Sequence, residues 1–165
     1  MQDQVNKSIK GTPTKDLFIS MLIRDLTLKD AIGDLVDNSV DGAKSIKEDG
    51  DYSDLWINIT ATNEEFVIAD NCGGIAVQTA RDYAFRFGRP KDTPQTKGSI
   101  GQFGIGMKRA LFKLGNVFEI KSVASNSSFT MKVNVGDWRD VENNWDFEFD
   151  QLEEGVQENP VEDRG

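Results

Sequence analysis

Apolar residues recur at helical spacing in the first third of the chain. Residues 14–26 carry three apolar side chains at this spacing behind Thr14, which can cap the start of a helix. A longer apolar face predicts a second helix over residues 28–48. Thr27 and Asp30 resemble a capping box with a shorter acid, so this helix is expected to begin directly after Thr27.

Shorter runs of alternating polar and apolar residues predict strands in the rest of the chain, with two more helices between them. The expected strands cover residues 55–61, 66–70, 116–125, 128–135 and 145–152, and the expected helices cover residues 77–87 and 105–114. This order predicts an α+β fold in which helices pack on one face of a mixed, mostly antiparallel sheet.

A loop and a glycine run precede the helix at residues 105–114. Residues 88–100 have no apolar periodicity and contain two prolines, which predicts a loop that is a candidate lid. Residues 98–106 hold four glycines and lead directly into the helix, an arrangement that can cradle phosphate. A structural turn is the alternative, since the run matches neither the dinucleotide fingerprint nor a P-loop.

Two further segments carry candidate chemistry. Asp34, Asn38 and Asp41 are spaced at i, i+4 and i+7 and therefore share one stripe of the second helix. An acid and an amide oxygen one turn apart can position a water and a hard cation together, although a solvated acidic face is the alternative. Asp70 ends a strand and is followed, after Asn71 and Cys72, by the paired glycines Gly73 and Gly74, which suits either a carboxylate that accepts from a nucleobase amine or a simple turn.

Composition excludes several chemistries. The 165 residues make one domain by size, and they include no histidine, which removes imidazole metal sites and Ser-His or Cys-His nucleophile pairs from this chain. The single Cys72 excludes an internal disulfide and is consistent with a cytoplasmic location. We expect it to be a small packing residue rather than a reactive thiol. No apolar stretch is long enough to span a membrane.

The net charge of −9 is concentrated at one end of the chain. Residues 137–165 hold eleven acidic residues against two arginines, whereas residues 1–136 hold seventeen charges of each sign. No basic surface of the kind that binds nucleic acid is therefore expected.

The three segments together resemble the GHKL superfamily, the ATPases of gyrase, the ninety-kilodalton heat-shock chaperones, histidine kinases and MutL-type mismatch-repair proteins. The run Ile-Gly-Gln-Phe-Gly-Ile-Gly is most similar to the heat-shock chaperones, whereas Gly-Met-Lys and Asp-Leu-Val-Asp-Asn are more similar to the microrchidia ATPases. The resemblance spans roughly residues 14–165 and implies a Bergerat fold, an α/β sandwich with its ATP lid at residues 88–100. It also implies a further strand after Gly165, so the chain is expected to be the N-terminal part of a longer protein.

The resemblance assigns roles to individual residues. It implies that Asn38 coordinates Mg²⁺, and that Asp70 binds the adenine amine in a pocket lined by Gly74 and Ile75. The residues expected to supply the backbone cradle for the phosphates are Gly101, Phe103, Gly104, Ile105 and Gly106. Lys108 is expected to approach the phosphates, with a surface helix cation as the alternative, and Lys97 in the lid is a weaker candidate.

Asp34 stands where the ATPase branches usually carry glutamate as the general base. A base must come within about 3 Å of its proton, and a misplacement of about 1 Å can cost on the order of 10²-fold in rate. The shorter aspartate therefore predicts either a slow base or a helix that lies closer to the nucleotide. Asp37 is an unlikely substitute, because it lies one residue before Asn38 in the helix and is therefore turned about 100° away from that side chain.

The activity implied by the resemblance is Mg²⁺-dependent ATP binding with slow hydrolysis to ADP and phosphate. Binding would act as a conformational switch that drives homodimerisation. The alternative is a nucleotide-dependent binding module with little or no hydrolysis. A histidine-kinase catalytic domain ranks third, because an acidic residue precedes Asn38 and any phosphoacceptor histidine would have to lie elsewhere.

Overall fold

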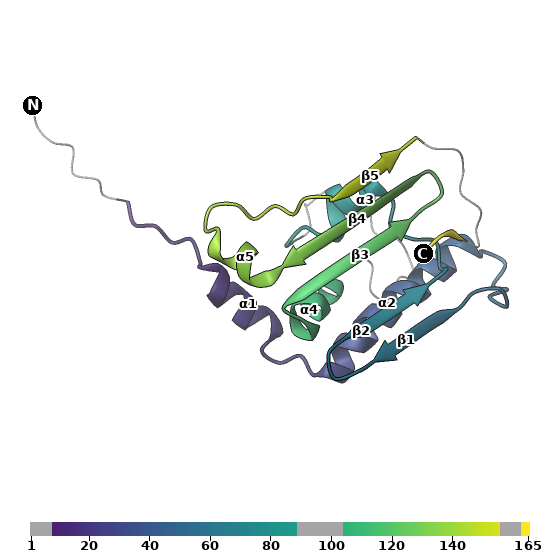
Figure 1. The fold of residues 1–165 in the computed structure, drawn as a ribbon, viewed down its shortest axis with the longest axis horizontal. Helices are drawn as coiled ribbons and strands as arrows, with labels where there is room; N and C mark the ends of the chain where they lie inside the picture. Colours follow the sequence, from purple (N-terminus) through teal and green to yellow (C-terminus); the bar gives the residue numbers. More distant parts are fainter. Residues whose placement is uncertain (1–7, 89–103, 156–162) are drawn as a thin grey trace, which may run out of the picture.

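Helices on one side of two antiparallel sheets form the architecture of the chain (Figure 1). The structure is a computed structural model that describes residues 8–88, 104–155 and 163–165. Helices α2 (Leu28–Ile46) and α4 (Ile105–Leu114) run behind the strands in the figure, and α1 (Lys15–Ile23) lies at one end. The predicted α+β class is confirmed.

The first two helices begin where their caps predict. The hydroxyl of Thr14 accepts a hydrogen bond from the backbone N–H of Leu17, and the hydroxyl of Thr27 accepts one from Asp30 at 3.1 Å. Thr27 also donates to the Asp30 carboxylate at 2.7 Å, so the shortened acid completes the capping box through the side chains.

The strands form two separate sheets in the described part of the chain. Strands β1 (Ile57–Ala61) and β2 (Phe66–Asp70) pair antiparallel, with Ile57 opposite Asp70. The second sheet is also antiparallel, in the order β3-β4-β5, and its strands are β3 (Val117–Val123), β4 (Ser127–Asn134) and β5 (Gln151–Glu154). Residues 163–165 lie between the two sheets, because Gly73 N–H donates to the carbonyl of Arg164 and Val123 N–H donates to that of Gly165.

The core lies between β3, β4 and the helices. Alternate residues of β4 are buried, namely Phe129, Met131 and Val133, as expected for a strand with one covered face. Met107 and Phe112 of α4 pack into the same cluster. This packing fixes α4, and with it the glycine-rich helix start, against the second sheet.

Three sequence predictions need correction. The helix expected at residues 77–87 is a short α3 (Val77–Thr79) followed by one π-helical turn, η1 (Ala80–Ala84). The strand expected over residues 145–152 forms a ladder only at β5. A further helix, α5 (Val135–Asp140), was not predicted. It begins at Asn134, whose side-chain oxygen accepts hydrogen bonds from the backbone N–H groups of Gly136 and Asp137.

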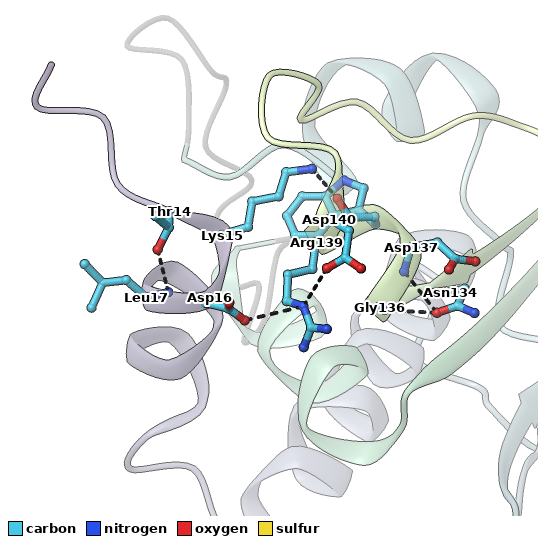
Figure 2. A network of polar contacts seen from close by, with 10 residues as sticks. Thr14, Lys15, Asp16, Leu17, Asn134, Gly136, Asp137, Arg139 and Asp140 are labelled. Carbon is cyan, nitrogen blue, oxygen red and sulfur yellow. Dashed lines mark hydrogen bonds and ion pairs between the residues drawn. The ribbon is translucent and has the colours of Figure 1, made fainter.

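A buried lysine holds α1 against α5 (Figure 2). The ammonium group of Lys15 donates to the carbonyls of Trp138 and Asn144 at 2.5 and 2.6 Å. It also lies 3.9 Å from the centre of the Trp138 ring, a cation–π geometry. Burial lowers the pKa of Lys15, and the two carbonyls and the ring supply the partners that a buried ammonium needs.

Among the described helices, none combines the length and the apolar character needed to cross a bilayer.

Candidate functional site

The first turn of α4 contacts the acidic stripe of α2. A Cβ atom placed on Gly106 would lie 3.2 Å from the carboxyl carbon of Asp34, which is tighter than most real Cβ contacts. Any larger residue at this position would therefore push the Asp34 carboxylate aside by a few tenths of an ångström. The contact places the Asp34 carboxylate beside the helix start, where free backbone amides and the helix dipole favour an anion.

The electrostatics of Asp34 reflect this partly buried position. Burial raises the pKa of its carboxyl group, the guanidinium of Arg109 lowers it, and the carboxylates of Asp37 and Asp30 raise it further. Arg109 is itself held in place, because its Nε donates to the carbonyl of Leu22 at 3.1 Å. The net shift is upward, so Asp34 takes up a proton more readily than an exposed aspartate.

Asn38 lies one turn further along the same stripe. Its side-chain amide nitrogen donates to the backbone carbonyl of Asp34 at 2.7 Å, which leaves its carbonyl oxygen available as a ligand. Within the described residues, no three acidic, thiol or imidazole side chains come together to bind a metal. An oxygen ligand supplemented by phosphate and water is the donor set that Mg²⁺ commonly takes, so Asn38 fits the cation expected here.

Asp70 faces α2 at the end of β2. Its carboxylate accepts a 2.6 Å hydrogen bond from the hydroxyl of Ser39, the residue directly after Asn38. The other oxygen accepts from the backbone N–H of Cys72 at 2.8 Å. Helix α2 therefore connects the stripe of Asp34 and Asn38 with the carboxylate of Asp70.

The loop after Asp70 crosses from the first sheet to the second. Gly74 adopts a φ of +64°, and a Cβ atom there would lie 2.2 Å from the carbonyl oxygen of Val123, so no side chain fits. The backbone N–H of Ile75 donates to the hydroxyl of Ser122 on β3 at 2.7 Å. Both residues expected in the adenine pocket thus lie directly against β3.

Cys72 is a packing residue in this loop, as expected. It is 3% exposed, and its sulfur lies 3.8 Å from the carbonyl oxygen of Trp56. Burial first, and then the neighbouring Asp70 carboxylate, raise the pKa of the Cys72 thiol to about 11.

We expect Cys72 to resist alkylation while the chain is folded. At pH 8 a thiol with this pKa is almost entirely protonated, and the thiolate is the reactive form. Iodoacetamide should therefore modify the folded chain at least about 100-fold more slowly than the same chain unfolded in urea. Mass spectrometry of quenched time points measures both rates, and equal rates would contradict the buried position.

The structure describes only part of the segment that is expected to bind phosphate. Gly104 is the N-cap of α4, Ile105 is 52% exposed and Gly106 contacts Asp34. Gly101, Phe103, Lys97 and the lid after Gly88 lie outside the described residues.

Lys108 points away from solvent. It is 3% exposed, and its ammonium group donates to the carbonyl of Ala84 at the end of η1 at 2.9 Å. The alternative of a surface helix cation is therefore wrong. Its approach to the phosphates stays a prediction.

A cavity of about 800 Å³ lies elsewhere in the fold. It opens between η1 and the segment that carries Trp145 and Phe147, and none of the predicted site residues lines it. The geometry of the candidate site therefore comes from the contacts of α2 rather than from this cavity.

A comparison with protein families found a match over most of the chain. Residues 26–162 match the family described as histidine kinase-, DNA gyrase B- and HSP90-like ATPases. The chain belongs to this family. Membership implies ATP binding as its activity. A comparison with curated protein sequences found no match.

Three residues that support the candidate site carry little or no signal in the sequence. Ser39 and Ser122 each hydrogen-bond a predicted site residue from another element, and the charge of Arg109 acts on Asp34 from α4. Ser39 carried one usable signal, since it lies next to Asn38 in the same helix. Arg109 and Ser122 carried none, because only the packing of α4 and β3 brings them to the site.

Proposed function

We propose that this chain binds Mg²⁺ and ATP and hydrolyses ATP slowly to ADP and phosphate. The observation that carries the proposal is the contact between Asp34 and Gly106. It joins a carboxylate that can orient water to the helix start that can hold phosphate, in a family of ATPases. The close approach of the two helices offsets the missing methylene of aspartate.

Each group has a defined task in this mechanism. Asp70 accepts from the adenine amine, with its two oxygens held by Ser39 and the Cys72 amide, while Gly74 and Ile75 line the base. The amides at the start of α4 bind phosphate oxygens. The Asn38 oxygen holds Mg²⁺, which neutralises phosphate charge when bound.

Asp34 would act as the base that orients the attacking water and accepts its proton. Its neighbour Arg109 opposes the effect of burial on the pKa and so favours the ionised form that a base requires. The acidic limb of the turnover profile should follow the ionisation of Asp34 and lie above the pH at which an exposed aspartate titrates.

The bound nucleotide would serve as a conformational switch, with residues 88–100 as its lid and an ATP-dependent homodimer as its output. We place the protein in the cytoplasm, since its one cysteine forms no internal disulfide. The second candidate function is a nucleotide-dependent binding module without useful turnover, which the short side chain of Asp34 favours. Steady-state phosphate release from the protein with Mg²⁺ and ATP separates the two functions.

We expect Asn38→Ala to abolish the contribution of Mg²⁺ to ATP affinity. In calorimetric titrations with a non-hydrolysable ATP analogue, the wild-type chain should bind at least about tenfold more tightly with Mg²⁺ than without it, a difference of about 1.4 kcal/mol. The variant should bind equally in both conditions and keep its affinity for Mg²⁺-free ADP.

The matched control is Asp37→Ala on the adjacent position of α2, which should retain the response to Mg²⁺. Failure of the wild-type chain to bind any adenine nucleotide would overturn the proposed function. An intact Mg²⁺ response in Asn38→Ala would remove only Asn38 from the site.

A further inference from the structure

We propose that Ser122 and Ser127 are positioning residues that fix the wall of the adenine pocket. The inference rests on the proposed function. Neither hydroxyl is placed to contact the nucleotide in the mechanism above. Ser122 binds the backbone of the loop between β2 and α3, the segment that carries Gly74 and Ile75, and Ser127 binds the first residue of α3, where this loop ends.

Ser122 satisfies two backbone groups of one residue. Its Oγ accepts from the N–H of Ile75 at 2.7 Å and also donates to the carbonyl of Ile75, with an oxygen–oxygen distance of 3.3 Å. Ser122 lies on β3 and is 3% exposed. A backbone amide and carbonyl inside the fold need partners, and here one buried hydroxyl serves both.

Ser127 repeats this arrangement on the neighbouring strand. It begins β4, is 5% exposed, and its Oγ accepts from the N–H of Val77 at 3.2 Å. Val77 is the first residue of α3, so the hydroxyl acts as a cap supplied by the sheet for a helix whose own N-cap, Ala76, has no capping side chain.

Gly74, directly before the first anchored residue, passes equally close to the sheet. A Cβ atom there would lie 2.2 Å from the carbonyl oxygen of Val123, the residue after Ser122, so only glycine fits at this distance from β3. The hydroxyls therefore set how far the wall stands from the sheet. Asp70 is held from the other side, by Ser39 of α2 and by the N–H of Cys72 at the start of the loop, so the serines help to set the spacing between the wall and the carboxylate that reads the base.

This assignment predicts a selective defect. Ser122→Ala should leave the buried N–H and carbonyl of Ile75 without a partner, and the loop should relax toward water. The wall then shifts while the phosphate side on α2 and α4 stays in place. Affinity for the adenine end of the ligand should fall, and affinity for a bare phosphate chain should not.

Calorimetric titration of the whole chain with Mg²⁺-free ADP and with inorganic tripolyphosphate tests the proposal. We expect Ser122→Ala to bind ADP about tenfold more weakly and tripolyphosphate within about twofold of wild type. Ser122→Thr, which keeps the hydroxyl, should restore most of the ADP affinity. Hydrogen exchange at the amides of Ile75 and Val77 should accelerate in Ser122→Ala and Ser127→Ala, respectively, a readout independent of nucleotide.

Two controls separate positioning from general destabilisation. Ile120→Ala removes a partly buried side chain from the same strand, so it should lower the Tm while leaving ADP affinity within about twofold. Ser128→Ala changes the neighbour of Ser127 on β4, and it should alter neither ligand's affinity. If Ser122→Ala does not fold, Ser127→Ala carries the same ligand test.

The outcomes distinguish this proposal from the function on which it rests. A wild-type chain that binds neither ADP nor tripolyphosphate overturns both. A wild-type chain that binds ADP, with Ser122→Ala or Ser127→Ala binding it equally well, overturns the positioning role alone. An equal loss of ADP and tripolyphosphate affinity also overturns it, because the defect would then be a general one.

Discussion

Replacing Asp34 with asparagine is expected to lower the turnover number of the chain about 10²- to 10⁴-fold, the contribution typical of a general base. The amide occupies the same space beside Gly106 but cannot accept the proton of the attacking water. Affinity for ADP should stay within about twofold, because no contact proposed for ADP uses the Asp34 carboxylate. Phosphate release under saturating Mg²⁺ and ATP measures the loss.

The same substitution should raise thermal stability at neutral pH. Burial raises the pKa of Asp34 in the folded chain, so the folded state binds its proton more tightly than the unfolded state does. The free energy of unfolding therefore falls as the pH rises from the ordinary aspartate range through the raised pKa. At pH 7 the ionised carboxylate lowers stability relative to a neutral amide, and Asp34→Asn should have the higher Tm.

Measuring the Tm of both chains over a series of pH values tests the direction of this effect. The Tm advantage of Asp34→Asn should be greatest at neutral pH and should shrink in acid, where Asp34 is protonated in both states. The matched control is Asp37→Asn, which lies three residues after Asp34 on the same helix and is turned about 60° from it. It should keep the wild-type turnover within about threefold, although loss of its charge lowers the pKa of Asp34 slightly. Turnover by Asp34→Asn at the wild-type rate would exclude Asp34 as the base and favour another water-orienting group.

Local patterns predicted the helices well because their signals lie within each segment. The expected bounds of α4 match the structure, since Gly104 precedes a helical apolar face that ends at Leu114. The π-helical turn η1 could not be predicted, because its extra residue per turn leaves no mark on a short apolar pattern. Asn134 signalled the start of α5, but it ends a strand pattern that concealed the cap.

The last predicted strand shows how packing overrides alternation. Trp145, Phe147 and Phe149 do point toward the core, as their period of two predicts. The ladder nevertheless begins only at β5, and just before it the side chain of Asp150 accepts from the backbone N–H of Lys132 at 2.7 Å. The backbone N–H of Lys132 on β4 is therefore bound by a side chain instead of by the backbone of a neighbouring strand. The sequence pattern gives no sign of this substitution.

In the candidate site, too, the contiguous motifs could be predicted from the sequence and the contacts between elements could not. Its motifs were found because each is contiguous, and the left-handed Gly74 could be anticipated from the paired glycines after Asp70. The contacts of Asp34 with Gly106 and of Ser39 with Asp70 each join different elements. They follow from how α2 packs between α4 and the end of β2, which is a property of the whole fold.

Gly74→Ala is expected to cause a large loss of both stability and nucleotide binding. The new Cβ atom would lie 2.2 Å from the backbone oxygen of Val123, and neither partner is a flexible side chain that could move aside. The left-handed φ of +64° adds backbone strain of about 1 kcal/mol. The loop must therefore leave β3, and the hydrogen bond from Ile75 to Ser122 should break.

Gly50→Ala is the control that separates these two effects. Gly50 has a similar φ of +78°, but a Cβ atom there would meet no atom within 4 Å. Its substitution should lower the free energy of unfolding by about 1 kcal/mol and leave ADP affinity unchanged. Gly74→Ala should cost at least about 2 kcal/mol more, in the range of a steric clash in a packed interior, and weaken ADP binding about tenfold or more. Urea denaturation with parallel ADP titration measures both quantities. Equal costs at Gly50 and Gly74 would mean that the loop yields freely, and that β3 does not define the proposed adenine pocket.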